Sequence, residues 1–140
     1  MTESPISGPA SVAAPDPVWL AARPDDRLPS AFRFLTEIAA WVALPWAIAD
    51  TSIVLGVFVG LMMVAVPTVF ATPGDKRQVL VPVSGKVTIA LVAAHILAAL
   101  YGSWSAWPVW PAVPTTVVAL MTIVTEMPRW RWLWGAAGRR

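Results

Sequence analysis

Two apolar stretches decide the fold, and only Asp50 and Thr51 separate them: residues 31–49, AFRFLTEIAAWVALPWAIA, and residues 52–70, SIVLGVFVGLMMVAVPTVF. Each stretch has 19 residues, and as an α-helix it would be about 29 Å long, close to the roughly 30 Å hydrocarbon core of a bilayer. Apolar residues lie all round these helices, whereas a helix at the surface of a soluble protein has one apolar stripe. The pair therefore predicts two transmembrane helices joined by a tight turn.

Two further apolar segments follow, at residues 87–104 and 109–127. With the first two they predict an all-α protein, an integral membrane four-helix bundle over residues 31–128. The composition agrees, because 57% of the 140 residues are hydrophobic and only 13% are charged, against about 25% charged residues in soluble domains.

The positive charges predict the orientation of these helices. All ten lysines and arginines fall before or at the start of the first helix, between the second and third, or after the fourth: Arg23, Arg27, Arg33, Lys76, Arg77, Lys86, Arg129, Arg131, Arg139 and Arg140. The other two loops carry none. By the positive-inside rule, both termini are predicted to be cytoplasmic, in a multi-pass protein of a bacterial cytoplasmic (inner) membrane.

Residues 1–30 are predicted to be a disordered tail. They contain six prolines, each of which fixes φ and removes a backbone donor, and they have no apolar run long enough to bury. The alternative is a segment that orders on a partner, with Val18, Trp19 and Leu20 as the contact.

Residues 129–140 are predicted to be a basic, tryptophan-rich C-terminal tail. Indole rings favour the headgroup boundary, and cations beside them suit anionic lipid headgroups. We therefore expect lipid-interface anchors at Trp130, Arg131, Trp132 and Trp134.

Four ionisable residues lie within the predicted membrane region: Arg33, Glu37, His95 and Glu126. All four belong to the cytoplasmic half, so they are candidates for one polar cluster, and a functional role is the default for costly intramembrane charges. The structural alternative is that Arg33 pairs locally with Glu37 four residues later, while Glu126 pairs with nearby arginines. His95 is then an interhelical hydrogen-bond partner rather than a proton relay.

Other chemistry is not indicated. The chain has no cysteine and one histidine, which argues against disulfides and against zinc or haem sites. The net charge of +2 is too small to indicate a nucleic-acid partner. No known catalytic motif is present, so we expect no cofactor, no metal and no enzymatic activity.

Small residues recur every fourth position in two of the predicted helices, a pattern that lets helix backbones approach closely. They are Ser52, Gly56 and Gly60 in one helix, and Ala90, Ala94, Ala98 and Gly102 in another. We expect these faces to pack inside the bundle; a homodimer interface is the alternative.

Residues 32–40, FRFLTEIAA, resemble the opening of the first helix in the YrdB-like family of small bacterial membrane proteins. The resemblance continues more loosely to Leu100-Tyr101-Gly102 and covers residues 31–127. It implies four membrane helices and, since the family has no established activity, it implies no mechanism.

These observations favour a non-catalytic accessory or structural subunit of a membrane complex, whose partners are membrane lipids and either other subunits or a second copy of the chain. The alternative is a small proton-coupled carrier that uses Glu37, His95 and Glu126.

Overall fold

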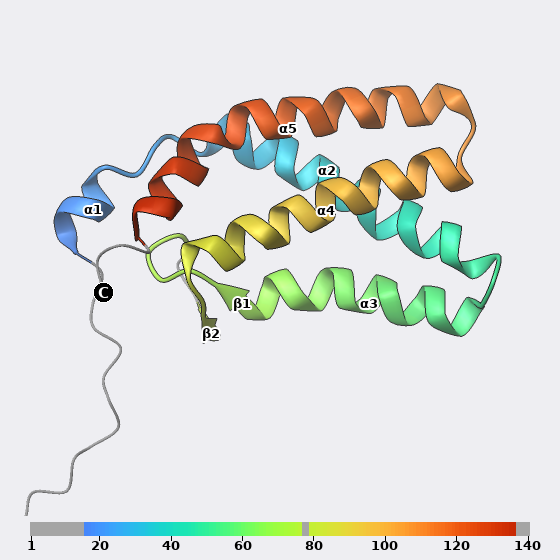
Figure 1. Cartoon of the computed structure of the whole chain (residues 1–140), viewed down its shortest axis with the longest axis horizontal. Coiled ribbons are helices and arrows are strands. Elements are labelled where there is room, and N and C mark those ends of the chain that lie inside the picture. Colours follow the sequence, from blue (N-terminus) through green and yellow to red (C-terminus); the bar gives the residue numbers. More distant parts are fainter. Residues whose placement is uncertain (1–15, 77–78, 137–140) are drawn as a thin grey trace, which may run out of the picture.

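The computed structural model describes residues 16–76 and 79–136, and it consists almost entirely of helices (Figure 1). The helices are α1 Pro17–Ala21, α2 Arg27–Ala49, α3 Ile53–Val69, α4 Gly85–Ala106 and α5 Val109–Ala136. Two strands of two residues each, β1 Phe70–Ala71 and β2 Val81–Pro82, pair in parallel between α3 and α4. The prediction of an all-α protein is confirmed.

Among the residues that the structure describes, three helices are long and apolar enough to cross a membrane: α2, α4 and α5. The fourth apolar helix, α3, has 17 residues and is about 26 Å long. Together with the apolar surface described below, these helices indicate a membrane protein.

The four long helices run alternately up and down, so α2 and α4 share one direction and α3 and α5 the other (Figure 1). Helix α2 packs against the other three, whereas α3 packs on α2 and barely touches α4. The tight α2–α3 and α4–α5 connections lie at one end of the molecule. At the other end lie α1, residues 70–76 and 79–84, and the last turns of α5; this is named the charged end below.

The helices approach closely because the residues between them are small. The buried core contains Ala40, Ala43, Ala98, Ala99 and Ala119. A Cβ on Gly102 would collide with the α2 backbone at Ala43 and Leu44, and one on Gly56 would lie 2.8 Å from the Pro45 carbonyl oxygen. The contacts confirm internal packing for these two glycines.

The alanine stripe of α4 is only partly internal. Ala98 is buried, whereas Ala90 and Ala94 are exposed. A step of four residues turns an α-helix by about 400°, so a four-residue repeat drifts by about 40° per step. Over three steps the stripe therefore leaves the helix–helix interface.

Large apolar side chains cover the outside of the molecule. On α3, Val54 is 81% exposed, Ile53 73% and Leu61 62%, and Gly56 is the buried residue of this helix. Apolar patches of this extent are rare on soluble monomers, and a hydrocarbon solvent removes their cost.

Both predicted tails are shorter than expected. Residues 17–21 are helical, Trp19 is buried, and α2 begins at Arg27 rather than at residue 31; residues 1–15 of the predicted tail lie outside the described residues. Helix α5 continues to Ala136, nine residues past its predicted end. Both differences have one cause: these two segments pack against each other, which neither local sequence could indicate.

Candidate functional site

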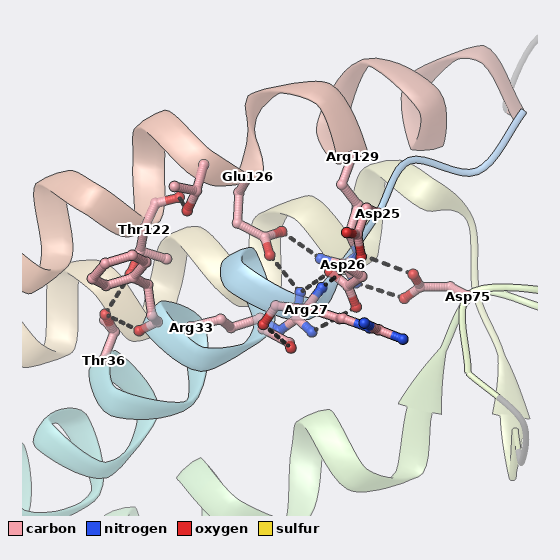
Figure 2. Close-up of polar contacts among 12 residues, drawn as sticks. Asp25, Asp26, Arg27, Arg33, Thr36, Asp75, Thr122, Glu126 and Arg129 are labelled. Carbon is pink, nitrogen blue, oxygen red and sulfur yellow. Dashed lines mark hydrogen bonds and ion pairs between the residues drawn. The ribbon is translucent and has the colours of Figure 1, made fainter.

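A buried carboxylate at the charged end organises the polar residues of the molecule (Figure 2). Glu126 of α5 is fully buried. One carboxylate oxygen accepts a hydrogen bond from the Arg33 guanidinium of α2, and the other accepts one at 2.5 Å from Arg129, one turn further along α5. Glu126 therefore links α5 to α2 through Arg33, while Arg129 of its own helix neutralises the other carboxylate oxygen.

The ion pairs extend beyond Glu126 on both sides. Arg129 donates through Nε and Nη2 to the two carboxylate oxygens of Asp75, at 2.9 and 2.6 Å. Arg33 contacts Asp26 at 3.3 Å, and Asp26 contacts Arg23 at 3.6 Å. The result is a row of alternating charges, named the charge chain below: Arg23, Asp26, Arg33, Glu126, Arg129 and Asp75.

The charge chain joins three segments that are distant in sequence: the start of α2, the 72–76 turn and the end of α5. A hydrogen bond from the Asp75 amide to the Thr72 carbonyl closes the turn, and Gly74 has φ 87°, which favours glycine. A Cβ on Gly74 would also collide with Leu20 and Trp19 of α1. The turn therefore holds Asp75 in place through its backbone and through α1.

Because the inner residues of the charge chain are buried, each of their charges needs an oppositely charged partner. The side chains of Asp75, Glu126 and Arg129 are 1%, 0% and 5% exposed. A buried ion without its partner destabilises a protein by several kcal/mol, whereas a complete pair roughly offsets its own desolvation. The charge chain therefore specifies which segments meet rather than adding much net stability.

Two threonines lie one helical turn deeper. Thr36 of α2 and Thr122 of α5 place their hydroxyls 2.7 Å apart, and both also bond to helix carbonyls. Ala40 and Ala119 follow in the core. The polar contacts between α2 and α5 therefore end at these threonines, and alanines fill the next level of the core.

A pair of tryptophans fastens α1 to the end of α5. The Trp19 and Trp132 rings stack with centroids 4.0 Å apart, and each indole N–H donates to the other residue's carbonyl oxygen, at 3.2 and 2.8 Å. Beside them, Leu133 packs against Gly85, and Lys86 lies 4.7 Å from the Trp134 ring centroid.

This pairing changes the picture of the predicted lipid anchors. Trp132 is buried against Trp19, and Trp130 packs partly buried against the core around Val92 and Ile96. Of the four predicted anchors, Arg131 and Trp134 are exposed. The prediction overlooked Trp19, which stacks on the Trp132 ring and accepts a hydrogen bond from its indole N–H.

His95 lies apart from the charge chain and links α4 to α3. It is 3% exposed, with Nε2 2.9 Å from the Met63 carbonyl oxygen and Nδ1 2.8 Å from the Leu91 carbonyl oxygen. Pro67 has no N–H to donate to the carbonyl four residues earlier, at Met63. The Nε2 atom of His95 lies within hydrogen-bond distance of that carbonyl, so the tautomer with its proton on Nε2 can donate to it and link α4 to α3.

Glu37 is half-buried, and it does not form the ion pair with Arg33 that the sequence predicts. Arg33, four residues earlier, bonds to Asp26 and Glu126 instead, so the predicted local pair does not form. Within residues 16–76 and 79–136, no hydrogen bond or ion pair reaches the Glu37 carboxylate. The four predicted residues thus separate: Arg33 and Glu126 meet, while His95 and Glu37 have other environments.

Sequence reasoning missed Asp26 and Asp75 as members of the charge chain. Asp75 lies in a Pro-Gly-Asp turn, which predicts a loop but does not indicate what the carboxylate contacts. In the part of the chain that the structure describes, no group of three His, Asp or Glu side chains is placed to hold a metal ion.

No protein-family model matches the chain, and no curated protein or solved structure is similar to it. The resemblance to the YrdB-like family stays a prediction.

Replacing Glu126 with Gln is expected to destabilise the fold by about 3–5 kcal/mol, because it removes the negative charge that Arg33 and the buried Arg129 share and leaves each arginine with one aspartate. The free energy of unfolding is measured by titrating SDS into mild-detergent micelles. Arg23→Gln is the matched control. It removes a charge from the exposed end of the charge chain and should lower the free energy of unfolding by less than about 1 kcal/mol. Equal losses for the two variants would contradict a buried network.

The link between His95 and Pro67 predicts a coupled pair of substitutions. His95→Ala leaves the Met63 carbonyl without a donor and is expected to cost about 1–2 kcal/mol. Pro67→Ala restores an amide that can bond this carbonyl, so the cost of His95→Ala should fall by about 1 kcal/mol in that background. The same unfolding titration measures both; strictly additive losses would show that His95 does not serve this carbonyl.

Proposed function

We propose that the chain is a four-span protein of a bacterial cytoplasmic membrane, with its charged end and both termini on the cytoplasmic side. The distribution of charge supports this orientation. The described cations of the charged end include Arg27, Lys76, Lys86 and Arg131, whereas the α2–α3 and α4–α5 connections carry none. Retention of cationic loops in the cytoplasm is the general rule for membrane insertion.

Within that membrane, we propose a non-catalytic accessory or structural subunit of a larger complex. The observation that carries this proposal is that the buried charges neutralise one another. Both oxygens of Glu126 and both ring nitrogens of His95 face partners in the same chain. Side chains whose polar atoms all contact partners in the same chain hold the helices together, and they leave no atom free to bind a substrate.

The alternative, a proton-coupled carrier, needs Glu37, His95 and Glu126 to act on one proton path. Glu126 contacts Arg33 and Arg129, while His95 contacts the carbonyls of Met63 and Leu91. No described contact joins any two of the three acid and imidazole groups. The geometry therefore favours the subunit over the carrier.

The subunit proposal predicts stoichiometric copurification. The tagged chain, produced at its native level and extracted in a mild detergent, should migrate in native electrophoresis in a complex much larger than its own 15.0 kDa. The complex should contain a second protein in fixed ratio by native mass spectrometry. Migration as a free monomer under every mild extraction condition would contradict the proposal.

A further inference from the structure

We propose that the outer face of the α2–α3 pair is the docking site for one transmembrane helix of a partner subunit, and that this helix carries a lysine or arginine that pairs with Glu37. This inference rests on the proposed function and deepens it, because it states where the partner binds and what chemistry it brings.

The face contains an apolar groove of about 620 Å³ between the two helices. Pro45 and Ala49 of α2 and Gly56 and Gly60 of α3 lie where the helices approach most closely. Larger side chains, among them Trp46 and Leu61, complete the lining. Because Gly56 and Gly60 already pack against Pro45 of α2, the surface open to an occupant is the shallow apolar groove that the larger side chains line.

Glu37 lies outside the lining of the groove, one helical turn before Trp41, which is the lining residue of α2 nearest the charged end. It precedes Trp41 by four residues, so these two side chains are neighbours on α2, and Trp41 lines the groove together with Pro45. Glu37 is half-buried and has no described partner. A carboxylate at this depth is costly unless an opposite charge approaches it.

A second unsatisfied group lies in the same wall. The indole Nε1 of Trp41 is buried and has no hydrogen-bond partner among the described residues. Buried donors without acceptors are rare in complete structures. The Trp130 indole, which lies outside the groove, is also buried without a partner among the described residues, so the Glu37 carboxylate is the polar group that an occupant of this face would meet.

The charge of the site selects among possible occupants. A second copy of this chain would bring another Glu37 to the face, and Arg33, the basic residue nearest in sequence, is engaged with Asp26 and Glu126. A lipid acyl chain would fill the groove but would leave Glu37 without a counter-charge. A helix from another protein, apolar with one basic residue near its cytoplasmic end, satisfies both the groove and the carboxylate.

The test uses the full-length chain in phosphatidylcholine vesicles and a synthetic transmembrane helix as the probe. The probe is a leucine–alanine helix with one lysine at the depth of Glu37, and its partner probe has leucine at that position. Association is measured by energy transfer between labels on the chain and on the helix. We expect the lysine helix to bind the wild-type chain about tenfold more tightly than the leucine helix, equivalent to about 1.4 kcal/mol.

Variants of the chain locate the effect. Glu37→Gln should remove the preference for the lysine helix, whereas Arg131→Gln, a charge change at the same end but outside the groove, should keep it. Glu37→Lys should transfer the preference to a probe that carries glutamate. Equal binding of the lysine and leucine helices, or a preference that survives Glu37→Gln, would overturn the inference.

The remaining outcomes separate the inference from the proposed function. Self-association of the wild-type chain that Glu37→Gln strengthens would assign the face to a second copy and overturn the inference. A native complex whose cross-links all lie on α4 and α5 would also overturn it while leaving the subunit proposal intact. Selective binding of the lysine helix without any native complex would support the docking face and contradict the subunit proposal.

Discussion

The fully buried carboxylate of Glu126 is the constraint on which the rest of the structure depends. An isolated charge in this position would be prohibitively costly, so Arg33 and Arg129 must both reach it. Arg129 in turn needs Asp75, which brings the 72–76 turn against the end of α5. The helices are packed through small residues that have little directional preference. The charge chain gives the bundle its register at one end.

For function, the polar residues fall into two groups: those that have partners within the chain and those that do not. Those of the charge chain, together with His95, are satisfied within the chain and have structural roles. Within the predicted membrane region of α2, Glu37 has no partner among the described residues, and the indole Nε1 of Trp41 is buried without one. They lie on the stripe that faces the α2–α3 groove. The molecule thus separates a closed, self-neutralised end from an open, apolar face with one acidic residue.

Much of the fold could be predicted from the sequence, because helix length and hydropathy are local properties. The order of residues alone predicted the turn between α2 and α3 and the absence of lysine and arginine from two of the loops. Pairing between distant segments was not. Arg33 has a carboxylate four residues away at Glu37, yet it bonds to Glu126, ninety-three residues later, because α5 delivers that carboxylate into a buried position. In the same way, nothing near Trp132 in sequence indicated that Trp19 would stack on it.

In the proposed orientation, the charged end and the two tight connections lie on opposite sides of a membrane. Because the chain contains no cysteine, single cysteines introduced at Asp50 and at Arg131 can be labelled with a membrane-impermeant maleimide in intact and in permeabilised bacterial cells. We expect Asp50→Cys to react in intact cells and Arg131→Cys to react only after permeabilisation. Reaction of both cysteines from the same side would contradict it.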